Sequence, residues 1–202
     1  MLVADDTAVA PIPRDAVPRD IVFDVYREGS EFGEHAIRFE RTQNGALIVN
    51  VEVELTAGLG PLTVFRYEHR AEEVWREGEL VRLTASTLKD GERRHVDIER
   101  VDGDMLASAG KPIPELLPSS HWRGYDPAMQ TVLSTETGQP MPVTVEDLGM
   151  DVVETASGPV RARHIRVTGT LPMDLWYDAS GRWVGCAFEA RGHFIEYVLR
   201  SR

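Results

Sequence analysis

Short runs of alternating apolar and polar residues, separated by turn residues, extend over most of this chain. The clearest run covers residues 46–56, where Leu47, Val49, Val51, Val53 and Leu55 alternate with polar side chains. Successive side chains of a strand point to opposite faces, so this pattern predicts an antiparallel strand with one buried face. Further strands are expected at 21–27, 32–41, 63–75, 80–87, 93–100 and 105–109. Asn44-Gly45 is the strongest short hairpin signal in the chain, and Asp90-Gly91 is another.

The strand pattern resumes near residue 140. Strands are expected at 141–148, 151–155, 160–169, 171–178, 182–190 and 193–200. This regular spacing predicts a mainly β fold, an antiparallel meander that forms a strongly curved sheet or an open or half barrel. With 202 residues, one domain is expected, at 21–202. Residues 1–20 are rich in Ala, Pro and Asp and are predicted to be a disordered or extended tail.

The alternation breaks at residues 110–130, which contain four prolines, Pro112, Pro114, Pro118 and Pro127. Proline prevents a regular strand or a long helix here, so we expect a proline-rich loop. Long irregular segments in compact domains are often lids or binding loops. A short helical turn is predicted at 126–133, with Asp126 as its N-cap and Pro127 at its first position.

The stretch 63–87 combines aromatic and ionisable side chains on one strand face. Phe65, Tyr67, His69, Glu73 and Trp75 share that face. The mixture suits a ligand pocket better than a dry core. His69 and Glu73 are four residues apart, roughly 13 Å along a strand, so each would have to meet a group on a neighbouring strand. The alternative is a face that is exposed or internally satisfied.

Other candidates for chemistry lie outside this stretch. His121 and Trp122 stand in the proline-rich loop, where reactive groups are often positioned. Asp174 alternates with Trp176 on the face opposite Leu175 and Tyr177. A carboxylate among aromatics would have a raised pKa, but the same Asp can simply face solvent. The candidate catalytic residues are His121, His69 and Asp174, and the candidate ligand-binding residues are Phe65, Tyr67, Glu73, Trp75, Trp122, Tyr125, Trp176, Arg163 and His193.

Composition excludes several classes of function. A net charge of -11 argues against a nucleic-acid partner and against electrostatic attachment to anionic lipid. No apolar run approaches the length of a membrane span. Cys186 is the one cysteine, so an internal disulfide and a Cys/His zinc site are excluded, and Cys186 is expected to be a small buried hydrophobe. No metal and no cofactor are expected.

Four segments in the C-terminal third carry a family resemblance: Met173-Asp-Leu-Trp-Tyr-Asp178, Gly181-Arg-Trp-Val-Gly185, Phe188-Glu-Ala-Arg-Gly192 and Ile195-Glu-Tyr197. Ser120-His-Trp122 and Asp24-Val-Tyr-Arg-Glu-Gly29 with Gly33 match the same pattern. The chain resembles, from about Val22 to Leu199, a family of uncharacterised, mostly exported bacterial proteins known as a domain of unknown function. That family has no assigned catalytic residues. Its β-rich pattern is similar to the half-barrel of periplasmic lipoprotein carriers, which implies a curved sheet around an apolar cavity.

Three functions follow as hypotheses. The first is binding of a small, largely apolar or aromatic ligand in the curved sheet. The second is a cofactor-free lyase, isomerase or hydrolase that uses His, Asp and Glu as acid and base in the same cavity. The third is a structural or assembly role in the cell envelope. The resemblance implies a periplasmic or otherwise exported protein whose leader is absent, with a cytoplasmic location left open, and a homodimer is one option for its oligomeric state.

Overall fold

The structure, a computed structural model, describes residues 17–59, 62–170 and 172–200. Most of the tail expected at 1–20 lies outside the described residues, and residues 17–20 have no regular secondary structure. Apart from a 3-10 turn at Ser108–Gly110, the described residues form strands, turns and loops. No helix in this part of the chain could cross a membrane.

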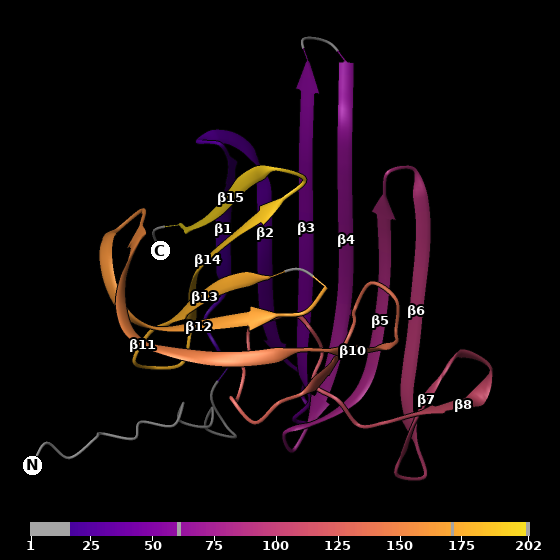
Figure 1. Cartoon of the computed structure of the whole chain (residues 1–202). Coiled ribbons are helices and arrows are strands. Elements are labelled where there is room, and N and C mark those ends of the chain that lie inside the picture. Colours follow the sequence, from indigo (N-terminus) through magenta and orange to yellow (C-terminus); the bar gives the residue numbers. More distant parts are fainter. Residues whose placement is uncertain (1–16, 60–61, 171, 201–202) are drawn as a thin grey trace, which may run out of the picture.

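One 13-stranded sheet contains nearly all the strands, and each strand is antiparallel to its neighbours (Figure 1). Its first series runs from the N-terminal strand to the outer hairpin: β1 (Ile21–Arg27), β2 (Ser30–Arg41), β3 (Leu47–Leu59), β4 (Leu62–Arg76), β5 (Glu79–Lys89), β6 (Glu92–Val101), β7 (Asp104–Ala107) and β8 (Lys111–Ile113). The second series is β11 (Thr144–Thr155), β12 (Gly158–Thr168), β13 (Met173–Tyr177), β14 (Trp183–Ala190) and β15 (His193–Leu199). The predicted mainly β, curved antiparallel sheet is confirmed.

The two series are joined by the first and last strands of the domain. β15 pairs with β1, with Phe23 opposite Leu199, whereas β8 and β11 stand at the two ends of the strand order and do not pair with each other. The sheet is therefore an open half-barrel. In Figure 1, the strands β11–β15 cross in front of the strands β1–β5 at a steep angle.

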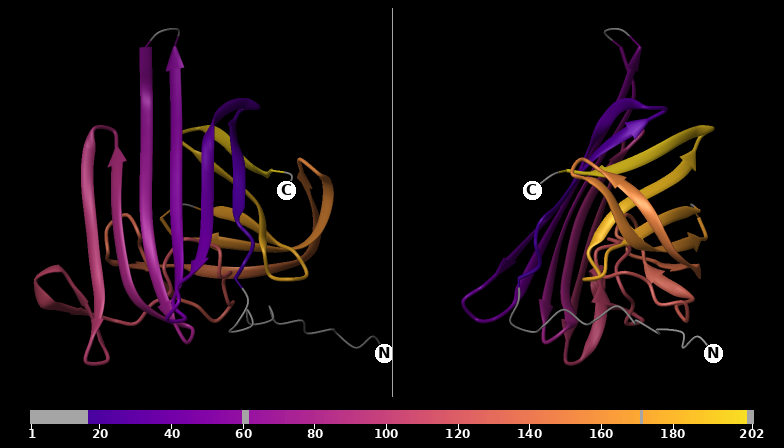
Figure 2. Two further views of the ribbon diagram at one scale, coloured as in Figure 1. Left: turned by 180° about the vertical axis from the view of Figure 1, so that it is seen from behind. Right: turned by 90° about the vertical axis from the view of Figure 1, so that its left-hand side faces the viewer.

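Residues 114–143 connect the two series, and we call them the covering segment. It contains the small sheet of β9 (Thr131–Leu133) and β10 (Pro140–Pro142). Figure 2 shows this segment near the lower ends of the long strands, beside β5 and β6. Its Val132 and Leu133 are almost fully buried, so it contributes to the core.

The side-chain alternation predicted for the strands is confirmed. Leu47, Val49, Val51, Val53 and Leu55 are buried on the concave side, called the inner face below, and the intervening polar residues point to the outer face. Cys186 is buried as expected. The face of β4 that carries His69 and Glu73 is the inner one, because both residues are buried.

Three local predictions are wrong. Residues 126–133 form no helix: Asp126 accepts hydrogen bonds from Ala128 and Met129 in a single turn, and the chain then enters β9. The strands expected at 141–148 and 151–155 are one strand, β11, because Gly149 accommodates a bulge within it instead of a turn. The strand expected at 46–56 does not end at residue 56, because β3 continues to Leu59.

A second bulge shapes the sheet at Gly33, where the pairing of β1 and β2 shifts register. Gly33 has φ +153, and a Cβ atom there would lie 1.9 Å from the backbone oxygen of Glu54 on β3. Only glycine allows this close approach of two strands.

Gly33→Ala is therefore expected to lower the free energy of unfolding by about 3 kcal/mol or more, measured by urea denaturation. Gly29→Ala is the matched control, because Gly29 has φ +74 but no atom within 4 Å of the new Cβ. The control should lose only the cost of a left-handed alanine, about 1–2 kcal/mol. Equal losses for the two variants would contradict the steric account.

Candidate functional site

Strand pairing brings a line of side chains together across the inner face. Residues paired in successive strands lie side by side, and from β15 to β6 the line consists of Leu199, Phe23, His35, Val53, His69, Thr87 and Arg94. His35 on β2 and His69 on β4 therefore lie on either side of Val53, which is on β3 between them. Their separation is about 10 Å, twice the spacing between strands.

His35 is enclosed by aromatic rings. It is 6% exposed, and neither ring nitrogen has a hydrogen-bond partner among the described residues. Its neighbours lie edge-on at ring-centroid distances of 6.4, 5.2 and 5.7 Å, and they are Phe23, Trp183 and Tyr197. Burial, with the nearby His121 and His69, lowers the pKa of His35 well below its usual value. His35 is therefore neutral at pH 7, and edge-on aromatic contacts are its weak substitute for hydrogen bonds.

His69 is also buried and neutral, but it has a partner. Its Nδ1 lies 2.8 Å from the hydroxyl of Thr87 on β5, the neighbouring-strand contact that its position suggested. Burial lowers the pKa of His69 to about 4. Its Nε2 makes no hydrogen bond to the described residues, so one polar atom of this ring retains hydrogen-bonding capacity.

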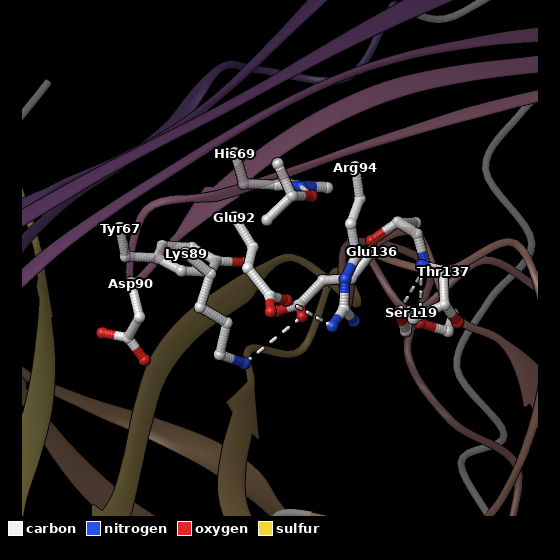
Figure 3. A network of polar contacts seen from close by, with 12 residues as sticks. Tyr67, His69, Lys89, Asp90, Glu92, Arg94, Ser119, Glu136 and Thr137 are labelled. Carbon is white, nitrogen blue, oxygen red and sulfur yellow. Dashed lines mark hydrogen bonds and ion pairs between the residues drawn. The ribbon is translucent and has the colours of Figure 1, made fainter.

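Tyr67 links the inner face of β4 to the covering segment. Its hydroxyl donates a hydrogen bond of 2.8 Å to Glu136, whose other carboxylate oxygen lies 3.3 Å from Nζ of Lys89. Figure 3 shows Tyr67 and Lys89 converging on Glu136 from β4 and β5, with His69 close by. Burial and the Glu136 carboxylate raise the pKa of Tyr67, so it remains a neutral donor.

Glu73 anchors the other end of the covering segment. Its side chain is fully buried, and its Oε2 accepts hydrogen bonds from the indole nitrogens of Trp75 (2.8 Å) and Trp122 (3.0 Å). Its Oε1 is buried and makes no hydrogen bond to the described residues. Burial raises the pKa of Glu73, partly offset by the nearby Ser120 hydroxyl and the two indoles, so the neutral acid is favoured. Glu73 therefore fastens Trp122 to the sheet.

His121 stands between the covering segment and the second series of strands. Its Nδ1 lies 2.6 Å from the Tyr125 hydroxyl, its carbonyl accepts a hydrogen bond from Tyr177, and its ring meets Trp183 at 5.2 Å. Burial lowers the pKa of His121 to about 4. These contacts place the predicted lid in a docked position on the inner face.

The remaining candidates lie elsewhere. Asp174 and Trp176 point to the outer face, where Asp174 accepts hydrogen bonds from Arg166 and lies 2.8 Å from Nε2 of His164. Arg163 pairs with Asp147, and His193 is at the rim, 3.9 Å from Glu28. Phe65 stacks on Phe32 near the upper rim.

The structure thus brings together seven of the predicted residues along the inner face: Tyr67, His69, Glu73, Trp75, His121, Trp122 and Tyr125. Asp174 does not meet His69 or His121, because it projects from the opposite face of β13. Sequence reasoning missed His35, Glu136 and Tyr197. The alternation of His35 with Ile37 was the one available signal, and the Gly33 bulge obscured it.

Neither a metal centre nor a surface hollow provides a better site in the part of the chain that the structure describes. Among the described residues, no group of three His, Cys, Asp or Glu side chains could hold a metal ion. A shallow hollow of about 680 Å³ lies over the outer face of β2–β6, lined by residues such as Asn50, Glu72, Ser86 and His95. Its lining includes five charged side chains and no Phe, Tyr or Trp. Sites for apolar ligands are lined mainly by apolar and aromatic side chains, so the inner face is the candidate site.

Comparisons with known proteins agree with the architecture. A crystal structure of a beta-barrel-like protein of domain of unknown function DUF1849 from Brucella abortus superposes with a TM-score of 0.65 at 12% sequence identity. The match covers 91% of this chain and 95% of that chain, and at this identity it shows a shared fold alone. A comparison with curated proteins found no match. The family model of DUF6134, a domain of unknown function, matches residues 23–200, and the chain therefore belongs to the DUF6134 family.

Proposed function

We propose that this protein binds a small, largely apolar ligand on the inner face of its half-barrel, between β1–β6 and β11–β15. The observation that carries the proposal is the set of incompletely paired polar groups among aromatic side chains on that face. Buried polar atoms normally have partners, and exceptions call for an explanation such as a ligand or water. Here His35, His69 and Glu73 all keep polar atoms without partners among the described residues.

The covering segment is the proposed lid of this site. At one end its Trp122 donates a hydrogen bond to Glu73 of the sheet, and at the other its Glu136 accepts one from Tyr67 of the sheet. Most of its remaining contacts are apolar, so opening it would expose the inner wall of β3–β6. A ligand that replaces these contacts would therefore compete with the docked segment.

The alternative of a cofactor-free enzyme has weaker support. It needs a base and an acid within hydrogen-bond reach of one substrate atom. Asp174 is on the outer face, and the carboxyl group of Glu73 already binds two indoles. Binding is therefore the function that the geometry supports best.

We place this function in the bacterial envelope, on the resemblance to mostly exported proteins. Fractionation of cells that produce the protein from its complete gene tests the location. Recovery in the periplasmic fraction is expected, and recovery with the cytosol would contradict it.

The site is tested by titration with N-phenyl-1-naphthylamine, an apolar dye whose fluorescence rises in apolar surroundings. Phe65→Ala and Phe188→Ala, which shorten partly buried aromatics on the inner side, are expected to weaken dye binding about tenfold, or about 1.4 kcal/mol each. Phe194→Ala is the control, because Phe194 is 45% exposed on β15 with outward orientation. Failure of the unchanged protein to bind dye, or equal weakening by all three changes, would contradict the proposed site.

A further inference from the structure

Charged side chains that approach the inner face are paired at its rim. Lys89 and Asp90 are consecutive residues at the β5–β6 turn, and each reaches a different part of the chain. Lys89 contacts Glu136 of the covering segment, and Asp90 forms an ion pair with Arg191 at the β14–β15 turn. The two ion pairs thus connect the β5–β6 turn to the covering segment and to the β14–β15 turn.

Deeper on the inner face, the polar side chains are uncharged. His35 and His69 have lowered pKa values because they are buried, and the pKa of Tyr197 is raised by burial. Glu73, also buried, favours its neutral acid. Arg123 is near Glu73, but its guanidinium lies over the rings of Trp75 and Trp122 and donates a hydrogen bond to the carbonyl of Gly78 in the β4–β5 turn.

Two of these neutral groups retain hydrogen-bonding capacity on facing parts of the half-barrel. The hydroxyl of Tyr197 on β15 makes no hydrogen bond to the described residues, and neither does Nε2 of His69 on β4. The ring of Tyr197 lies 5.7 Å from that of His35, and His35 is separated from His69 by Val53 on the strand between them, so the three side chains lie on the same part of the inner face. A hydroxyl and a neutral imidazole nitrogen can each donate or accept a hydrogen bond, the imidazole according to its tautomer.

This arrangement discriminates between head groups by their charge. A buried ion needs an opposite charge and several hydrogen bonds to offset its desolvation. Among the described residues, the charged groups nearest His69 are Glu136 and Arg94, and they already form ion pairs with Lys89 and Glu92. A hydroxyl or an ester carbonyl needs only one or two hydrogen bonds. The same polar groups would therefore satisfy a neutral head and leave an ionic head uncompensated.

We propose that the inner face binds amphipathic molecules with a neutral, hydrogen-bonding head group, such as long-chain alcohols or monoacylglycerols, in preference to fatty acids and alkylammonium ions. The head group contacts Tyr197 and His69, and the alkyl chain lies along the apolar inner wall. This inference rests on the proposed ligand-binding function and adds the chemical class of the ligand.

Matched ligands with one alkyl chain and different heads test the inference. Dodecanol, dodecanoate and dodecylammonium are compared at pH 7.5, below their aggregation limits, by displacement of N-phenyl-1-naphthylamine. Dodecanol is expected to bind at least tenfold more tightly than either ion. Equal affinity for the three, or tighter binding of an ion, would overturn the head-group inference while leaving the binding function intact. Displacement by none of them, with no dye bound, would overturn the proposed function itself.

Tyr197→Phe separates the head-group contact from the apolar contacts. The variant keeps the ring and loses the hydroxyl, so dodecanol affinity is expected to fall about fivefold while dye affinity stays unchanged. Tyr26→Phe, a change of the same kind on the outer side of β1, should leave both affinities unchanged. If Tyr197→Phe binds dodecanol as well as the unchanged protein does, the hydroxyl is not the head-group contact. A thermal melt of each variant confirms that it is folded.

Discussion

Trp122→Ala is expected to lower the free energy of unfolding by about 3–5 kcal/mol, the usual cost of removing a buried tryptophan. Trp122 is 4% exposed, and its ring packs edge-on against Trp75 and Phe39. The change also removes one of the two indole donors to the buried carboxyl group of Glu73. The covering segment should lose its main attachment to the sheet. Urea denaturation followed by circular dichroism measures the effect.

Trp176→Ala is the matched control for this prediction. Trp176 is partly buried on the outer face, where it stacks on His164 and donates a hydrogen bond to Asp151. Among the described residues it makes no hydrogen bond or ring contact with the covering segment. Its loss should cost less than half as much. The single cysteine offers a second readout, since Cys186 is buried on the inner face. Thiol reagents should modify it faster in Trp122→Ala than in Trp176→Ala, and equal rates would argue against the covering segment as a lid.

Acidification is expected to destabilise the protein between pH 6.5 and 4. The folded-state pKa of His69 is lowered from 6.5 to about 4, so in this window the unfolded chain binds a proton that the folded chain does not. The stability that neutral His69 supplies is complete above pH 6.5 and is lost as the pH falls. Two and a half pH units correspond to about 3 kcal/mol for this residue. His121, with its pKa lowered to about 4, and His35 act in the same direction.

Carboxyl groups modify this slope without reversing it. The raised pKa of Glu73 acts in the opposite direction, because folding becomes easier as that acid is protonated, but it is one group against three histidines. The lowered pKa values of Asp147 and Asp174 matter below their usual value of 3.8. His69→Gln should reduce the pH dependence by about 1.4 kcal/mol per pH unit between pH 6 and 5. His95→Gln, on the exposed outer face, should not change it, and an unchanged slope in His69→Gln would show that His69 is not the group responsible.

The alternation of side chains determined most of the secondary structure. β1 is found at Ile21–Arg27 as predicted, and the inner face of β3 and β4 consists of the residues that the period of two selects. Turn signals such as Asn44-Gly45, Asp90-Gly91 and Asp102-Gly103 lie between strands, because their residues tolerate the backbone conformations that tight turns require. These features depend on residues close together in the chain.

Bulges were beyond the reach of this pattern. Gly33 and Gly149 each interrupt a strand, yet a glycine within an alternating run can equally mark a turn, and Gly149 was taken as one. A bulge differs from a turn in that the residues before and after the glycine stay paired with the same neighbouring strand. Gly33 is required by the backbone of Glu54, which is 21 positions away in the chain.

The composition of the site was decided by tertiary structure. The sequence by itself determined that Tyr67, His69, Glu73 and Trp75 share a face, and that Asp174 and Trp176 share another. Only the fold decided that the first face is inner and the second outer, that Trp122 binds Glu73, and that Glu136 binds Tyr67. The physical reason is range: strand periodicity is set by neighbouring residues, whereas these contacts join residues 49 and 69 positions apart, which meet only when β15 pairs with β1 and the covering segment docks on the curved sheet.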